Sequence, residues 1–497
     1  MIAERVAAGL LRELGEAPAV WCDVDWSGPV EMLLRDESAV QAACGIMHVH
    51  GRASGGPRRL GVDYASAVAG VLAAQGVLAA ELARVRGARI ESVRTSVAQA
   101  ALLSVAQHLA VATTDDDWAE QWESGPRPPF RSREGLRFEV ESLEPEGWRR
   151  FWSYLGADAA DVAAGWWPFQ QRFATASCAL PASLFACARR FPLRDLLRVG
   201  EKAGVSVLPV RDEPEQPNAV PACTLRDLPG TARARPWTCG EPLEGIVVVE
   251  STRRIQGPMA GHVLRMLGAE VIRVEPPGGD PMRGVPPISG DCSARFRALN
   301  DGKRTIEIDL KSPSGREALR ELVAGADVFA HNWAPGRAER GGLDADVLAR
   351  VRPGLVFAWA SGWSPLPWPD PPLGTDFLVQ AHSGLAAAVD PEGAPSLMTL
   401  TDVMGGLVCA AGVLGALLRR ERTGLGARVD SSLYSAAGVI PRSSTGQSRF
   451  VLRDDRPVLP DGTPVCTDLR ELAADPRFKR ALHHTTHVSP QPPWEFA

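Results

Sequence analysis

The chain has 497 residues, of which 45% are hydrophobic and 23% are charged, and its net charge is −5. This composition is typical of a soluble globular protein, and the length predicts two domains or modules because one core rarely grows so large. The acidic balance excludes an extended nucleic-acid surface, and no apolar run reaches the roughly 18 residues of a membrane span.

Helical and strand patterns alternate in the first region, residues 1–118. They predict helices over 1–16, 65–85 and 96–111, and strands over 18–24 and 89–93. The second region, 119–240, is expected to be a small α+β domain followed by a linker at about 212–243. Its expected strands are 136–140 and 205–210, and its expected helices are 145–154 and 193–203. Proline-rich and polar residues mark the linker.

Strands and helices alternate in the third region, residues 241–440. The expected strands are 246–250, 270–275, 305–310, 327–330 and 355–360, with helices at 258–267, 313–324, 345–351 and 407–420. This order predicts an α/β fold with a doubly wound parallel sheet. No GxGxxG follows the first strand, so the usual nicotinamide-cofactor fingerprint is absent. Residues 441–497 are expected to form a short C-terminal tail.

Asp376 is the strongest candidate for chemistry. It follows a proline-rich run, residues 365–372, and precedes an apolar segment, so it is expected at or near the start of a helix. Backbone N–H groups and the helix dipole would hold its carboxylate ionised, as a carboxylate nucleophile requires. An aspartate at such a position more often only caps the helix.

Two parts of the chain repeat each other. Glu37, Gln41 and Gly45 match Asp376, Gln380 and Gly384 at an offset of 339 residues. The segment Ala88-Arg89-Ile90-Glu91-Ser92 matches Ala427-Arg428-Val429-Asp430-Ser431 at the same offset. Residues 1–118 are therefore interpreted as a partial, degenerate copy of the third region. Glutamate is one methylene longer than the aspartate at the matching position, so the Glu37 carboxylate would be displaced from the position of attack. We therefore expect Glu37 to be only a helix-start residue and the chain to hold one active site, at Asp376.

Several motifs between residues 243 and 437 carry a family resemblance. They are Gln256-Gly257-Pro258, the run from Leu267 to Glu275, Gly279-Asp280-Pro281-Met282-Arg283, the run from Asn300 to Leu310, Asn332-Trp333-Ala334-Pro335-Gly336, Arg340-Gly341-Gly342-Leu343, Asp376 with Gln380-Ala381, and the run from Arg422 to Gly426. In order and spacing this set resembles the class III (family III) CoA-transferases. Residues 30–210 look like the rear part of the same family.

The resemblance implies a Rossmann-like catalytic domain that binds CoA, with Asp376 as the nucleophile. It implies transfer of CoA from an acyl-CoA thioester to a carboxylic acid through an aspartyl intermediate. Acyl-CoA would be a substrate, with no tightly bound cofactor and no metal. The implied CoA contacts are Arg253, Arg283, Lys303, Arg304, Asn332, Trp333 and Arg340. Lys303 and Arg304, just before a strand, are the favoured pair.

The resemblance also implies a homodimer, or an intrachain pseudo-dimer because one chain carries both halves. The small domain would then cover Asp376 in its own chain or in a partner's. The nine cysteines form no CxxC pair, so reduced thiols and a cytoplasmic protein are expected. No membrane or nucleic-acid partner is expected.

Two other functions stay open. An acyl-CoA racemase or isomerase needs acid and base groups on both sides of the α-carbon, and His382 is a candidate. A non-catalytic CoA-thioester-binding protein would keep the fold without turnover.

Overall fold

A seven-stranded sheet forms the centre of the chain in the computed structural model, which describes residues 1–114, 123–213, 220–231, 240–364, 366, 368, 370–442, 450–454 and 456–497. Six strands are parallel and the last is antiparallel. In spatial order they are β11 (Arg304–Glu307), β8 (Glu270–Glu275), β7 (Val247–Ser251), β12 (Val328–His331), β13 (Val356–Ser361), β14 (Leu425–Ser432) and β6 (Cys223–Thr231). The predicted α/β class is confirmed.

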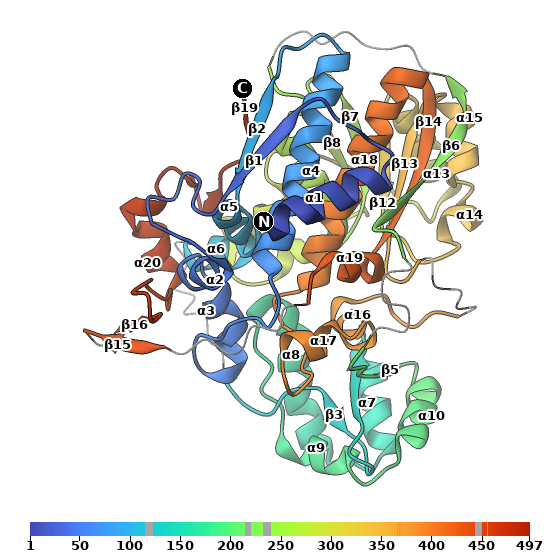
Figure 1. Ribbon diagram of the computed structural model, residues 1–497. Helices are drawn as coiled ribbons and strands as arrows, with labels where there is room; N and C mark the ends of the chain where they lie inside the picture. Colours follow the sequence, from blue (N-terminus) through green and yellow to red (C-terminus); the bar gives the residue numbers. More distant parts are fainter. Residues whose placement is uncertain are drawn as a thin grey trace.

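Helices cover both faces of this sheet (Figure 1). Val248 and Val356 point into a core with α11 (Gln256–Met266) and α18 (Leu400–Thr423), whereas the following residues, Val249 and Phe357, point into a second core. That second core contains apolar side chains of α13 (Pro313–Ala324) and α15 (Ala345–Val351). Because these strands are buried on both faces, apolar residues follow one another along them, and their sequences do not alternate between apolar and polar residues. The sheet is doubly wound, as predicted.

The segment expected to be a linker contains a strand. β6 pairs with β14 from Cys223↔Ser431 to Thr231↔Leu425. Its sequence, CTLRDLPGT, has few β-branched residues and includes a proline and a glycine. Such a strand is tolerated at the edge of a sheet, and pairing with β14 overrides its weak propensity.

The first copy is a reduced version of the second. Its sheet has the order β1 (Trp21–Asp25), β2 (Ser92–Ser96), β19 (Glu495–Phe496), with one parallel and one antiparallel pair, as in β13-β14-β6. The helices α2 (Glu37–Ala43), α4 (Tyr64–Val85) and α5 (Val97–Ser104) take the places of α16 (Asp376–His382), α18 and α19 (Leu433–Val439). The internal repeat is therefore confirmed, and the first copy has no counterpart of β11, β8, β7 and β12 among the described residues.

The two long helices α4 and α18 pack against each other at the junction of the copies. Both are long and apolar enough to cross a membrane by length and composition, with mean hydropathies of 1.6 and 1.8 in their most apolar windows. This differs from the expectation that no run would qualify. The windows are 100% and 94% buried, so protein packing accounts for their apolar character.

The small domain lies below α16 and α17 (Leu385–Val389) in Figure 1. Its sheet is β3 (Phe130–Arg131), β4 (Arg137–Glu141) and β5 (Ser206–Pro209), with helices α7 (Pro145–Tyr154), α8 (Ala159–Thr175), α9 (Ala182–Ala188) and α10 (Leu193–Ala203). The strands β4 and β5 contact α16, and the Arg172 guanidinium lies 4.6 Å from the centroid of the Phe377 ring. The domain that follows the first copy thus covers the second copy within one chain.

The C-terminal region passes in the opposite direction, from the second copy to the first. After α19 the chain leaves the second copy and returns as β19 to the sheet of the first. The Trp494 indole donates a 2.7 Å hydrogen bond to the Leu72 carbonyl of α4. The other elements are α1 (Ile2–Glu13), α3 (Ile46–Gly51), α6 (Ala106–Ala112), α12 (Ala294–Asn300), α14 (Arg337–Gly341), α20 (Leu469–Ala474), β9 (Ile288–Ser289), β10 (Cys292–Ser293), β15 (Val451–Arg453), β16 (Arg456–Val458), β17 (Leu482–His484) and β18 (Val488–Pro490), with short 3₁₀ turns at Arg52–Ser54, Pro281–Gly284 and Pro476–Phe478.

Glu37 is buried at the start of α2 and joins it to the start of α4. Its Oε1 accepts hydrogen bonds from Gln41 Nε2 and Ala65 N, both at 2.8 Å. Its Oε2 accepts from Ser66 N at 2.8 Å and Ser66 Oγ at 2.6 Å. The carboxylate therefore satisfies two backbone N–H groups at the start of α4 that would otherwise be buried without an acceptor.

Glu37→Ala is expected to lower the free energy of unfolding by about 3 kcal/mol, because it leaves those donors unsatisfied and opens a small cavity. Denaturant titration followed by circular dichroism measures the change. Glu31→Ala removes an exposed carboxylate of the same segment and should change stability by less than about 0.5 kcal/mol. Equal stability of the two variants would contradict the structural role of Glu37.

Candidate active site

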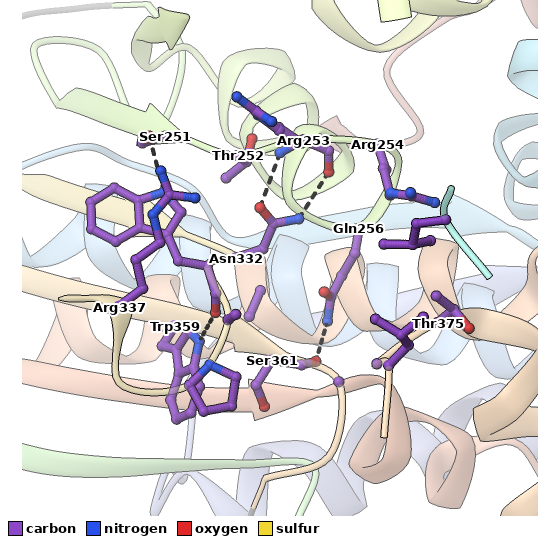
Figure 2. A pocket seen from close by; sticks show the side chains of 18 of the residues that line it. Ser251, Thr252, Arg253, Arg254, Gln256, Asn332, Arg337, Trp359, Ser361 and Thr375 are labelled. Carbon is purple, nitrogen blue, oxygen red and sulfur yellow. Dashed lines mark hydrogen bonds between the residues drawn. The ribbon is translucent and has the colours of Figure 1, made fainter. Parts of the chain in front are cut away.

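A cavity of about 990 Å³ opens at the carboxyl ends of the parallel strands. Its walls come from the loops that follow β7, β8, β12 and β13, from the starts of α16 and α18, and from Leu143 and Glu144 of the small domain. Figure 2 shows part of this lining. In open α/β sheets ligands bind at this edge, because the loops there converge from several strands.

Asp376 lies at one end of the cavity, at the first residue of α16, and is 3% exposed. Its Oδ1 accepts three hydrogen bonds: from Thr401 N at 2.6 Å, Thr401 Oγ1 at 2.6 Å and Asp402 N at 3.1 Å. Its Oδ2 accepts one, from Gln380 Nε2 at 2.5 Å. The carboxylate is thus fixed by the start of α18, and Oδ2 is the less encumbered oxygen.

Burial raises the pKa of Asp376 to about 6, and the hydrogen bonds from Thr401, Gln380 and Asp402 oppose that rise. At pH 7 most of this carboxyl is therefore ionised. Burial and the Asp376 charge raise the pKa of the neighbouring Asp402 well above its usual range, while Arg254 acts in the other direction. Two adjacent carboxyl groups at one cavity end are a common arrangement at catalytic sites.

Asp376 was expected to be capped by its own helix. Instead its backbone donors are Thr401 and Asp402 of α18, which lie 25 and 26 residues later in the sequence. The same arrangement joins Glu37 to α4 in the first copy. The backbone N–H groups of Ala65 and Ser66 correspond to those of Thr401 and Asp402.

Asn332 holds the loop that follows β7 in the cavity wall. Its Oδ1 accepts a hydrogen bond from Arg253 N at 3.0 Å, and its Nδ2 donates to Arg253 O at 2.8 Å (Figure 2). Trp333 lies next to it, with its indole donating to Ser251 Oγ at 3.2 Å. The three predicted residues Arg253, Asn332 and Trp333 all line the cavity.

Arg337 adds a cation beside Trp333. It lines the cavity, and its guanidinium lies 5.5 Å from the Trp333 ring centroid. Burial lowers the pKa of Arg337, and the charges of Arg253 and Arg340 lower it further. The charges of Arg253 and Arg340 thus act on Arg337. A cluster of guanidinium groups can bind an anion through paired N–H donors. Arg340 does not line the cavity itself but belongs to this group.

Lys303, one of the favoured pair, lies elsewhere. Its Nζ is buried and donates to Glu250 Oε1 at 3.0 Å, Pro258 O at 2.8 Å and Asn300 Oδ1 at 3.1 Å. The three donors of the ammonium group are thereby used inside the domain. Arg304 is exposed on the edge strand β11 and lies 3.6 Å from Glu270 Oε1.

Arg283 is bound to Glu275 through two hydrogen bonds, at 2.8 and 2.9 Å. Neither it nor Lys303 or Arg304 lines the cavity. Their assignment as CoA contacts stays a prediction, and the geometry does not bring them together with Arg253 and Asn332. A lysine just before a strand, such as Lys303, can bind a phosphate or form a buried ion pair. The sequence alone does not distinguish these two roles.

His382, the candidate for a second acid/base group, is buried at the end of α16 and does not line the cavity. Its ring packs among Trp363, Trp368 and Tyr434, with centroid distances of 5.6, 4.9 and 6.1 Å. This aromatic contact is the ordinary role of a buried histidine.

Sequence reasoning missed several residues of the cavity and of its support. Thr401 and Asp402 hold Asp376, Arg254 follows Arg253, and Arg337 and Trp359 lie beside Trp333. Arg254 and Arg337 could have been found from the sequence, because each is an arginine within five residues of a predicted site residue. Thr401 and Asp402 had a signal only through the repeat, where Ala65 and Ser66 begin an equivalent helix.

The sequence pattern of CoA-transferase family III matches residues 28–220 and 243–453. The chain is 38% identical over 199 residues to the acetyl-CoA:oxalate CoA-transferase of Acetobacter aceti, which covers 39% of this chain and 51% of that protein. It is 34% identical over 201 residues to the succinyl-CoA:glutarate CoA-transferase of Mus musculus, covering 39% and 46%. The chain therefore spans about half the length of the curated relatives it matches.

Among solved structures, Rv3272 from M. tuberculosis is 35% identical, with 40% of this chain and 57% of that chain covered and a TM-score of 0.37. A CAIB/BAIF family protein from Brucella suis is also 35% identical, covering 40% and 55%, with a TM-score of 0.37.

Thr401→Val is expected to raise the pKa of Asp376 above about 6, because it removes the hydroxyl donor on Oδ1 and keeps the backbone donor. Titration of the aspartate ¹³Cγ resonances, assigned with the Asp376→Asn variant, measures this pKa. Thr375→Val is the matched control, since Thr375 lines the cavity beside Asp376 and its hydroxyl has no hydrogen-bond partner in the described part of the chain. A pKa that is equal in both variants would show that the Thr401 hydroxyl does not stabilise the carboxylate.

Proposed function

Since the chain belongs to CoA-transferase family III, we propose that it transfers CoA from an acyl-CoA thioester to a carboxylic acid, with Asp376 as the covalent centre. One observation carries the proposal: a buried, ionisable carboxylate, Asp376, lines the same cavity as the arginines Arg253 and Arg337. The curated relatives are named as CoA-transferases that act on such pairs.

The arginines of the cavity suit the phosphates of CoA. Arg253 and Arg337 line the cavity, and Arg340 lies close enough to influence Arg337. Planar guanidinium groups bind phosphate oxygens bidentately, and the half-buried Trp359 offers an aromatic face in the same region. The thioester would then extend along the cavity toward Asp376.

The first half-reaction begins with attack of Asp376 Oδ2 on the thioester carbonyl carbon. The new C–O bond displaces the CoA thiolate and gives a mixed anhydride. The thiolate then attacks Asp376 Cγ, and the bond between Cγ and Oδ2 breaks, so that this oxygen leaves with the donor. The donor leaves as a carboxylate and Asp376 carries CoA as a thioester. The second half-reaction reverses these steps with the acceptor carboxylate and restores Asp376, with no net proton transfer.

Each attack on Asp376 Cγ puts negative charge on Oδ1. The two backbone N–H groups and one hydroxyl that already donate to Oδ1 would stabilise that charge without rearrangement. Fixed donors of this kind lower barriers by about 3 kcal/mol each when tested by removal. The start of α18 therefore serves as the oxyanion site for the aspartyl intermediates.

For assembly we propose a pseudo-dimer within one chain, supported by the α4–α18 contact and by the crossing of the small domain onto α16. A homodimer of such chains is compatible with this arrangement. For location we propose the cytoplasm, because the eight cysteines of the described residues are all unpaired.

Asp376→Ala is expected to abolish CoA transfer, by at least about 10³-fold, because it removes the covalent centre. Liquid chromatography–mass spectrometry of the acyl-CoA products measures transfer, and hydroxylamine trapping followed by peptide mapping locates the acyl-enzyme at Asp376. Glu37→Gln is the matched control and should stay within a few-fold of wild type. A hydroxamate at Glu37, or turnover by Asp376→Ala, would refute the assignment.

Arg337→Ala is expected to weaken binding of free CoA by about tenfold, with a smaller loss at high salt because exposed phosphate contacts are screened. Isothermal titration at low and high ionic strength measures the affinity. Arg304→Ala removes an exposed arginine outside the cavity and tests the earlier assignment of that residue. Unchanged affinity in Arg337→Ala would remove the arginine group from the nucleotide site.

A further inference from the structure

Arg254 is set apart from the other arginines of the cavity. Its side chain extends to the side where Thr375 lies, whereas the Arg253 and Arg337 side chains lie toward the Ser251 side (Figure 2). Its charge acts on the Asp402 carboxyl, and the Asp402 N–H donates to Asp376 Oδ1 at 3.1 Å. Arg254 is therefore the cation at the reacting end.

The backbone at Arg254 is held in an unusual conformation. Its φ is +64°, in the left-handed region that non-glycine residues rarely adopt. The preceding residue, Arg253, is clamped on both its N–H and its C=O by the Asn332 amide. Such outliers persist where the surroundings impose them, and they concentrate at ligand sites. The clamp turns two consecutive arginines toward opposite sides of one cavity.

The Arg254 guanidinium has no hydrogen bond or ion pair at contact distance within the described part of the chain. The carboxylates that line the cavity are Glu144, Glu275, Asp280, Asp309, Asp376 and Asp402, and none of them forms an ion pair with Arg254. Asp376 is committed to Thr401, Asp402 and Gln380, and Glu144 is exposed to solvent. The five N–H donors of Arg254 are thus available to a ligand.

We propose that Arg254 binds a second carboxylate of the acid substrate, so that the enzyme selects dicarboxylic acids and their mono-CoA thioesters. The inference rests on the proposed function, in which one carboxylate of the acid must reach Asp376. The carboxylate that reacts at Asp376 cannot at the same time form two parallel hydrogen bonds to the Arg254 guanidinium. An acid with a carboxylate at each end fills both positions, and a guanidinium binds the free one bidentately. Arg254 is a specificity-determining residue and takes no part in bond making.

The test measures binding, so that it does not depend on turnover. Glutarate and pentanoate have the same number of carbons and differ in one carboxylate. Each is titrated calorimetrically into the CoA-saturated full-length protein. Wild type should bind glutarate at least about tenfold more tightly than pentanoate, because a charge-assisted bidentate contact is made only by the diacid. Succinate and butyrate repeat the comparison at a shorter length.

Arg254→Gln removes the charge and keeps a polar side chain of similar reach. It should bring the glutarate affinity down to that of pentanoate and leave the affinity for free CoA within about twofold. Arg253→Gln, at the adjacent position, should do the reverse: weaker CoA binding and an unchanged diacid preference. Arg254→Lys restores charge without the fork and should recover only part of the preference.

Three outcomes would overturn the inference: no diacid preference in wild type, a preference that survives in Arg254→Gln, or a parallel loss of CoA affinity in that variant, which would make Arg254 a phosphate contact. Retained CoA binding shows that the variants are folded. If diacids bind through Arg254 but no CoA moves between acids, the proposed function fails while the diacid site stands.

Discussion

The attachment of the Asp376 carboxylate to the first turn of α18 is the interaction on which the site depends. A carboxylate buried at 3% exposure would hold its proton if nothing compensated its charge. Two backbone N–H groups, one hydroxyl and one amide compensate it, and the pKa stays near 6. The group is therefore mostly ionised at neutral pH although it is buried, and this is the state that the proposed nucleophilic role requires.

The same attachment is present in the first copy, with a different outcome. Glu37 accepts four hydrogen bonds from α2 and from the start of α4, as Asp376 does from α16 and α18. The sheet beside Glu37 has three strands. Among the described residues it has no counterpart of the strands β7 and β12, whose loops carry Arg253 and Asn332 in the second copy. In the described part of the chain, the first copy therefore keeps the carboxylate that joins two helices but has no equivalent of these strands beside it.

The two copies complete each other by exchanging segments. The chain that leaves the first copy builds the small domain and then adds β6 to the sheet of the second. The chain that leaves the second copy ends as β19 in the sheet of the first. Leu143 and Glu144 of the small domain line the cavity, so the wall opposite the sheet comes from the segment after the first copy. The first copy thus contributes to the site through the domain that follows it, although its own carboxylate is structural.

The sequence by itself determined the class of the fold, the repeat and the position of Asp376. Apolar runs of strand length alternating with amphipathic helices left little choice for residues 246–360, and helices such as Pro145–Tyr154 and Pro313–Ala324 have the bounds that their patterns predicted. Strand β6 could not be found, because its pairing with β14 and not its own propensity makes it a strand. The donors of Asp376, the clamp of Asn332 on Arg253 and the burial of Lys303 against Glu250 also came only from the tertiary structure. Each joins residues at least 25 positions apart, and a local pattern does not encode which distant backbone group or charge will face a side chain. Whether an arginine or lysine binds a ligand or an internal carboxylate is decided by that long-range packing.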